Sequence, residues 1–136
     1  MYIFETNIRV RYAETDQMAY VYYGNYPMYL EVARVEMLRS LGFTYKGFEE
    51  KGIMLPVVDL FIKYFKPALY DDLLRIKITV KKIPSSKIVF DYEIYNEKND
   101  LLTTAITTLV FISKETRKIC RPPEIFIESI SKHYTS

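Results

Sequence analysis

The segment YPMYLEVARVEMLRSL, residues 26–41, constrains the fold of this chain more than any other stretch. Its length and residue types predict an α-helix, with Pro27 in the first turn, where proline is tolerated, and Gly42 placed to end it. Its polar side chains scatter around the helical wheel, so the helix has no wholly polar face. A helix that is apolar nearly all round belongs in a core, and we therefore expect other elements to enclose it.

Segments with the residue pattern of strands make up most of the remaining chain. The predicted strands are residues 3–11, 53–65, 73–82, 87–96 and 101–113. The turns between the last three are short enough for antiparallel hairpins, and Pro56 belongs at an edge or a bulge. A basic turn and a Pro-Pro pair are predicted to end the regular structure. The order predicts one α+β domain over residues 1–136, in which four strands in meander follow the helix and an antiparallel sheet curls around it.

Composition and charge exclude several classes of function. The formal net charge of +2 is too small, and too evenly spread, for a nucleic-acid-binding face. Cys120 is the only cysteine, so neither an internal disulfide nor a zinc cluster can form. The sequence also lacks a signal-peptide pattern and an apolar run of roughly 18 residues, which a membrane helix needs. We therefore expect a cytoplasmic protein with no membrane span, and the open edges of the predicted sheet favour pairing with a second copy.

The loop before the predicted helix, YAETDQMAYVYYGNY at residues 12–26, places what looks like a lone buried carboxylate, Asp16, among five tyrosines. An aromatic-rich loop that leads into an apolar helix predicts a lined pocket. The helix start also offers unpaired backbone N–H groups and the positive end of the macrodipole. A carboxylate close to such donors is the arrangement that acyl transfer needs, although Asp16 taken alone fits a turn-forming or helix-capping residue better.

The stretch RYAETDQMAYVYYGNYPMYLEVARVEMLRSLG resembles the active-site segment of the hotdog-fold acyl-CoA thioesterases related to 4-hydroxybenzoyl-CoA thioesterase, including the YbgC-type enzymes. The PALYDD turn, the later hairpin strands and the closing RPP also match in order, so the resemblance covers almost the whole chain. It implies a hotdog fold, an antiparallel sheet around a central helix. It also implies hydrolysis of an acyl-CoA thioester to a free acid and coenzyme A by a homodimer or homotetramer, without metal or redox cofactor.

The resemblance also assigns roles to residues of the loop. The family's catalytic aspartate falls on Asp16, which acts either as a nucleophile or as a general base for water. The backbone N–H groups that polarise the thioester carbonyl fall at Tyr23 and Gly24, and Tyr12 matches a tyrosine four residues before the aspartate. The chain departs from the family pattern at Tyr23, where YbgC-type members often have histidine, and at Ala19, where the loop usually has glycine.

Coenzyme A phosphates are expected near basic side chains outside this loop. The Arg-rich turn of the 4-hydroxybenzoyl branch reads IPSSK here, which leaves Lys87 and the later basic residues Lys118 and Arg121 as candidates. Asp71 and Asp72 fit a turn better than a metal site, because no further ligands accompany them.

Other readings of the same residues remain open at this point. The chain could be a non-catalytic module that binds acyl-CoA or acyl carrier protein, or a thioesterase that acts on acyl carrier protein. A hotdog dehydratase fits least, because the only histidine, His133, lies in the C-terminal tail. The acyl group, the carrier, the choice between nucleophile and base, and the choice between dimer and tetramer are not fixed by the sequence.

Overall fold

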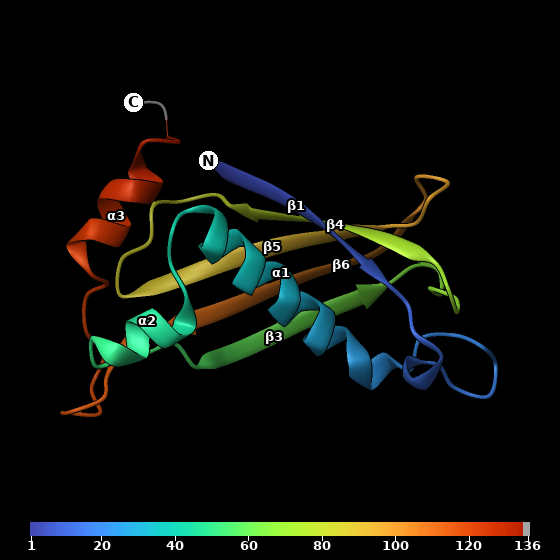
Figure 1. Cartoon of the computed structure of the whole chain (residues 1–136), viewed down its shortest axis with the longest axis horizontal. Helices are drawn as coiled ribbons and strands as arrows, with labels where there is room; N and C mark the ends of the chain where they lie inside the picture. Colours follow the sequence, from blue (N-terminus) through green and yellow to red (C-terminus); the bar gives the residue numbers. More distant parts are fainter. Residues whose placement is uncertain (135–136) are drawn as a thin grey trace.

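The computed structural model describes residues 1–134 and contains an α+β fold with a five-stranded antiparallel sheet in the order β1-β4-β5-β6-β3 (Figure 1). The strands are β1 (Tyr2–Arg9), β2 (Ile53–Met54), β3 (Val57–Tyr64), β4 (Leu73–Val80), β5 (Lys87–Tyr95), β6 (Leu101–Val110) and β7 (Ile112–Ser113). The helices are α1 (Tyr26–Ser40), α2 (Tyr45–Glu50) and α3 (Glu124–Ser131), and the single 3-10 turns are η1 (Tyr12–Glu14) and η2 (Tyr23–Asn25).

Helix α1 lies across one face of the sheet, as the hotdog reading predicted (Figure 1). Its buried residues recur every three or four positions: Tyr26, Tyr29, Leu30, Ala33, Arg34, Met37 and Leu38. The expectation that the helix is enclosed on all sides is wrong for the single chain, because Met28 and Glu31 on its other side are exposed. The sheet covers only the side of α1 that carries the buried residues. The polar residues of the helix lie on both sides, with Arg34 buried and Glu31 exposed.

The two strands at the centre of the predicted hairpins, β4 and β5, each turn one apolar face to the core. Leu74, Ile76, Ile78 and Val80 of β4 and Ile88, Phe90, Tyr92 and Ile94 of β5 are buried. Their alternate neighbours are more exposed for most of the length, which is the pattern of strands with one face on a core.

The predicted meander holds only for β4, β5 and β6, which pair in sequence order. Strand β3 instead pairs with β6 and forms one edge of the sheet, while β1 pairs with β4 and forms the other edge. Residues 65–72 therefore cross the end of the sheet from β3 to β4 instead of forming a hairpin. This crossing brings them beside the loop that follows β1.

Three local features differ from the sequence prediction. The strand expected at residues 53–65 breaks at Pro56 into β2 and β3, with a register shift just after it. The strand expected at residues 101–113 likewise divides into β6 and β7, and β7 pairs with β2. Helix α3 was missed, because the Pro-Pro pair was interpreted as a stop. Pro123 is its N-cap, since proline ends a preceding element but is well suited to start a helix.

Candidate active site

The loop of residues 12–22 folds tightly around Asp16. The backbone N–H of Asp16 donates to the carbonyl of Tyr20 at 2.8 Å, and the N–H of Ala19 donates to the carbonyl of Asp16 at 3.0 Å. Oδ1 of Asp16 accepts hydrogen bonds from the N–H groups of Met18 at 2.9 Å and Tyr20 at 3.3 Å. Within residues 1–134 no hydrogen bond reaches Oδ2 of Asp16. The carboxylate is therefore held through Oδ1, and Oδ2 has no hydrogen-bond donor in that part of the chain.

 Ala19 has a φ of +62°, in the left-handed region that favours glycine. The family resemblance places a glycine at this position, and the turn geometry gives the physical reason for that preference. The chain therefore carries backbone strain within three residues of Asp16.

The expectation that Asp16 is the lone buried carboxylate of the loop is wrong. Asp16 is half-buried, and the buried carboxylate is Glu14, whose exposed fraction is 5%. Arg11 and Tyr29 donate hydrogen bonds to Glu14, and Arg11 also forms an ion pair with it at 2.9 Å. Burial raises the pKa of Glu14, but the hydrogen bonds from Arg11 and Tyr29 and the Arg11 charge outweigh it and hold the pKa below its usual value. Glu14 is therefore ionised at neutral pH.

Asp16 faces an open pocket of about 300 Å³ whose walls come from two separate segments of the chain. The lining residues are Asp16, Tyr20, Val21, Tyr23, Tyr26, Tyr64, Phe65, Lys66 and Pro67. The aromatic-lined pocket predicted from the loop is thus present, and the crossing segment after β3 supplies its second wall. Burial raises the pKa of Tyr26 and of Tyr64, so these hydroxyls stay protonated at neutral pH and serve as hydrogen-bond donors instead of bases.

The backbone N–H groups at Tyr23 and Gly24 are those that the family resemblance assigns to the thioester carbonyl. Within residues 1–134 neither group donates a hydrogen bond, because both belong to the first turn of η2, before α1 begins. A side chain at Gly24 would meet the ring of Tyr22, since an added Cβ would lie 2.6 Å from its Cε2 atom. Glycine at this position therefore allows the close approach of that ring.

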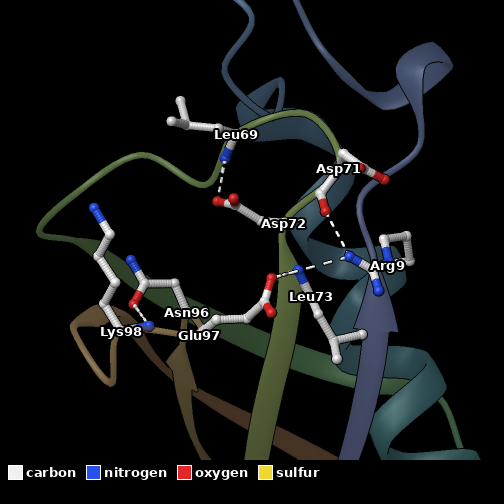
Figure 2. A network of polar contacts seen from close by, with 8 residues as sticks. All are labelled: Arg9, Leu69, Asp71, Asp72, Leu73, Asn96, Glu97 and Lys98. Atoms are coloured by element: carbon white, nitrogen blue, oxygen red, sulfur yellow. Dashed lines mark hydrogen bonds and ion pairs between the residues drawn. The ribbon is translucent and has the colours of Figure 1, made fainter.

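The crossing segment of residues 67–72 holds the loop from outside. Val21 donates its N–H to the carbonyl of Ala68 at 2.8 Å, and Tyr70 donates to the carbonyl of Ala19 at 3.2 Å. Figure 2 shows how this segment is fixed in turn: Asp72 accepts the N–H of Leu69 at 2.9 Å. The loop that contains Asp16 is therefore held in place by a segment far from it in the sequence.

Arg9 and Glu97 tie the same segment to the sheet. Arg9 donates to the carbonyl of Asp71 at 2.8 Å and lies 3.9 Å from the carboxylate of Glu97 (Figure 2). Glu97 also accepts the N–H of Leu73 at the start of β4. Asp71 and Asp72 thus act in a turn, as the sequence predicted, and within residues 1–134 no group of three or more His, Cys, Asp or Glu side chains could hold a metal ion.

Tyr12 lies on the outer side of the loop, where 78% of it is exposed and its ring meets the edge of the Tyr70 ring at 5.6 Å. Within residues 1–134 its side chain forms no hydrogen bond to Asp16. Tyr12 and Asp16 nevertheless line the same shallow hollow, together with Ala13, Thr15 and Gln17.

The predicted phosphate-binding residues lie at the opposite end of the sheet from Asp16. We call the end with residues 12–24 and 64–72 the site end, and the end with residues 81–87 and 114–121 the basic end. Lys87 pairs with Val110 on β6, whereas the pocket residue Tyr64 pairs with Thr103. Seven residues along one strand correspond to roughly 23 Å. One chain therefore does not bring Lys87 to its own pocket.

The basic end has a hollow of its own. It measures about 290 Å³ and is lined by Lys81, Lys82, Ile83, Pro84, Ser85, Lys87, Val89 and Asp91. Lys118 and Arg121 lie in the adjacent segment, because Cys120 donates to the carbonyl of Phe111 and Phe111 donates to that of Ser86. The ring of His133 packs at a tilt against the ring of Tyr2 at the start of β1, which is also remote from Asp16.

The sequence analysis missed Glu14 and the second wall of the pocket. The only local signal for Glu14 was Arg11 three residues earlier, a spacing that is common in exposed pairs. Tyr64, Phe65 and Lys66 had no signal at all, because only the crossing between β3 and β4 brings them to the loop.

No helix in residues 1–134 is both long enough and apolar enough to span a membrane.

Comparisons with known proteins agree on one family. The family model described as "Thioesterase-like superfamily" matches residues 10–130. A Bacillus subtilis protein named "Putative acyl-CoA thioesterase YneP" is 38% identical over 118 residues, which cover 87% of this chain and 86% of that protein. The "Acyl-CoA thioester hydrolase YbgC" of Escherichia coli O6:H1 is 31% identical over 81% of this chain and 82% of its own length.

Solved structures share the whole fold. The DHNA-CoA thioesterase of Staphylococcus aureus superposes with a TM-score of 0.91 and 40% identity, over 98% of this chain and 91% of that one. A variant of 4-hydroxybenzoyl-CoA thioesterase in complex with 4-hydroxybenzoyl-CoA has a TM-score of 0.82 and 21% identity, over 93% and 97% of the two chains. The second likeness concerns the fold alone, and it confirms the hotdog architecture.

Proposed function

The chain belongs to the thioesterase-like superfamily and is a thioester hydrolase, and from that premise we propose that Asp16 initiates the hydrolysis of an acyl-CoA thioester to a free acid and coenzyme A. One observation carries the proposal. The free oxygen of Asp16 and the undonated N–H groups at Tyr23 and Gly24 belong to one short loop, and Asp16 and Tyr23 line the same pocket.

The N–H groups supply the electrostatic part of the reaction. A thioester carbonyl bound in the pocket accepts hydrogen bonds from Tyr23 and Gly24, which stabilise the negative charge that develops on its oxygen. Because these donors are not used within the described part of the chain, no hydrogen bond has to break when substrate binds. Their fixed position at the start of η2 makes the stabilisation available throughout the reaction.

Asp16 supplies the acid–base or nucleophilic part by one of two routes. As a nucleophile, its carboxylate attacks the carbonyl carbon, the thiolate of coenzyme A leaves, and water then hydrolyses the mixed anhydride. As a general base, it takes a proton from a water that attacks the same carbon, and the proton goes to the departing sulfur. Both routes balance with water as the only other reactant, so the proposal uses no metal or redox cofactor.

The walls of the pocket place aryl thioesters first among the substrates to test. Four tyrosines and one phenylalanine surround the space beside Asp16, and flat rings pack well against such walls. The 40% identical relative from Staphylococcus aureus is described as a DHNA-CoA thioesterase. Benzoyl-CoA is therefore the first probe, with acetyl-CoA and palmitoyl-CoA as the short-chain and long-chain alternatives.

A second copy of the chain completes the proposed site. Strand β3 pairs only with β6 within residues 1–134, and most of its apolar side chains are exposed, up to 64% for Phe61. Antiparallel pairing of β3 with the same strand of another copy covers this edge and brings the basic end of each copy to the pocket of the other. Lys87, Lys118 and Arg121 of the second copy are then the candidates for the coenzyme A phosphates.

The test is thiol release from the three thioesters by the native protein and by Asp16→Asn, which keeps the shape of the side chain. We expect the variant to lose at least about 100-fold in kcat while its thermal unfolding midpoint stays close to that of the native protein. Release by neither protein, with acyl-CoA still bound, would instead support the non-catalytic binding module. Release from acyl carrier protein thioesters alone would support the acyl-carrier thioesterase.

A further inference from the structure

Glu14 is the buried carboxylate closest in sequence to Asp16, and the proposed reaction does not use it. Its side chain accepts three hydrogen bonds and forms one ion pair, all with two residues. Oε1 accepts from the N–H of Arg11 and from the hydroxyl of Tyr29, both at 2.9 Å. Oε2 accepts from Nε of Arg11 at 3.0 Å and forms the ion pair with Nη2 at 2.9 Å. The side chain therefore joins the start of the loop to the buried inner face of α1.

The backbone of Glu14 joins the same loop to the segment that contains the free N–H groups. Its carbonyl accepts hydrogen bonds from the N–H of Tyr22 and from Nδ2 of Asn25, both at 2.9 Å. Tyr22 and Asn25 flank Tyr23 and Gly24 directly on either side. Glu14 itself lies only two residues before Asp16.

We propose that Glu14 is a positioning residue that fixes the carboxylate of Asp16 relative to the N–H groups of Tyr23 and Gly24. The inference rests on the proposed thioesterase function, since both partners belong to that reaction. Glu14 touches neither the pocket nor the reacting atoms, and it acts through the short links on either side of it. Its side-chain bonds keep residue 14 in place, and its carbonyl transmits that position to Tyr22 and Asn25.

The chemistry of the network requires a carboxylate at residue 14. All four partner atoms are donors, so the group between them has to accept through both oxygens. Glutamine has the same size but replaces one oxygen with a donor NH₂, which would face either the Arg11 guanidinium or the Tyr29 hydroxyl. Glu14→Gln therefore breaks at least one link without creating a cavity.

Two variants loosen this support from different sides. Glu14→Gln changes the acceptor, and Tyr29→Phe removes one donor that lies on α1, outside the loop. We expect kcat to fall roughly tenfold to 100-fold in Glu14→Gln and less in Tyr29→Phe, because small displacements of reacting groups lower the rate strongly. We expect KM to stay within about twofold, because the displaced groups act mainly in the transition state. The double variant should lose less than the product of the two effects, since both act through one network.

Tyr92→Phe is the matched control for a merely structural effect. Like Tyr29, Tyr92 is a buried tyrosine with a hydrogen-bonded hydroxyl. Its partners are Arg34 and Thr107, and it lies in the core on β5. We expect it to lower the thermal unfolding midpoint about as much as Tyr29→Phe does and to leave kcat unchanged. Equal losses of kcat in the two phenylalanine variants would overturn the inference.

A readout that needs no turnover separates this inference from the proposed function. The amide protons of Met18 and Tyr20 donate to Asp16, so their nuclear magnetic resonance shifts report the position of its carboxylate. We expect both chemical shifts to change in Glu14→Gln and to remain at their native values in Tyr92→Phe.

If the native protein hydrolyses no thioester, the proposed function fails and the amide shifts still decide whether Glu14 positions Asp16. If thiol release depends on Asp16 but Glu14→Gln keeps the native kcat, the positioning role alone is wrong. If Glu14→Gln does not fold, Tyr29→Phe carries the same test.

Discussion

The site end and the basic end of the sheet are built in different ways. At the site end, residues 12–24 are held by a buried carboxylate on one side and by the crossing segment on the other, with most bonds close to 2.9 Å. At the basic end, three lysines surround a hollow in which the ion pair between Lys81 and Asp91 spans 3.5 Å. Bond-breaking chemistry needs fixed geometry, whereas phosphate groups can be attracted by charge over a range of positions. The contrast fits the proposal that the two ends divide the work of one site between two copies.

Mixing two impaired variants tests that division most strongly. In a composite site, Asp16→Asn chains and Lys87→Glu chains form heterodimers in which one site has both native residues. Random assembly should then restore about a quarter of the native rate at low substrate concentration, far above either variant alone. Thiol release after mixing, with light scattering to confirm that dimers form, measures the effect. A mixture no more active than the average of the two variants would place the complete site within one chain.

A smaller effect is expected from Lys87 alone. Lys87→Ala removes one exposed charge from the basic end, and we expect KM for the coenzyme A thioester to rise roughly two- to fivefold with kcat unchanged. The difference from the native protein should shrink as salt is added, because exposed charges are screened. Lys98→Ala, in the turn between β5 and β6, is the control and should leave KM unchanged. A fall in kcat caused by Lys87→Ala would contradict a role limited to phosphate binding.

The smallest predicted effect concerns stability at the site end. Ala19→Gly relieves the positive φ of residue 19, and we expect the free energy of unfolding to rise by about 1 kcal/mol. Urea unfolding measures the change, and Asn99→Gly is a suitable control because asparagine at a φ of +66° already tolerates this region. A lower stability for Ala19→Gly would show that the flexibility glycine adds to the unfolded chain outweighs the strain.

Periodicity and turn chemistry allowed much of the fold to be predicted. The inward residues of β4 and β5, the two hairpins and the span of α1 all follow from local patterns. The position of β3 in the sheet could not be predicted, because its residues are exposed on both faces and carry no alternation that identifies a neighbouring strand. Helix α3 was missed because proline was taken only as a breaker and not as a helix start.

The candidate site was predictable where the loop itself carried the information. The family resemblance assigned roles to Asp16, Tyr23 and Gly24, and the tyrosines of the loop predicted a pocket. The buried state of Glu14 depends on Tyr29, fifteen residues later, and no local pattern reveals that contact. The wall formed by Tyr64 and Phe65 depends on a crossing between strands, which is likewise invisible to local reasoning.

The pairing of β3 with β6 has a consequence for the order in which the protein is assembled on the ribosome. Strand β3 ends at residue 64, but its partner spans Leu101–Val110. Until that later strand has emerged, Tyr64 and Phe65 have no sheet to hold them, and the loop around Asp16 lacks a fixed second wall. The sequence separation also makes this contact a slow one to form. The nascent chain therefore completes its candidate active site late, only after most of its residues have been synthesised.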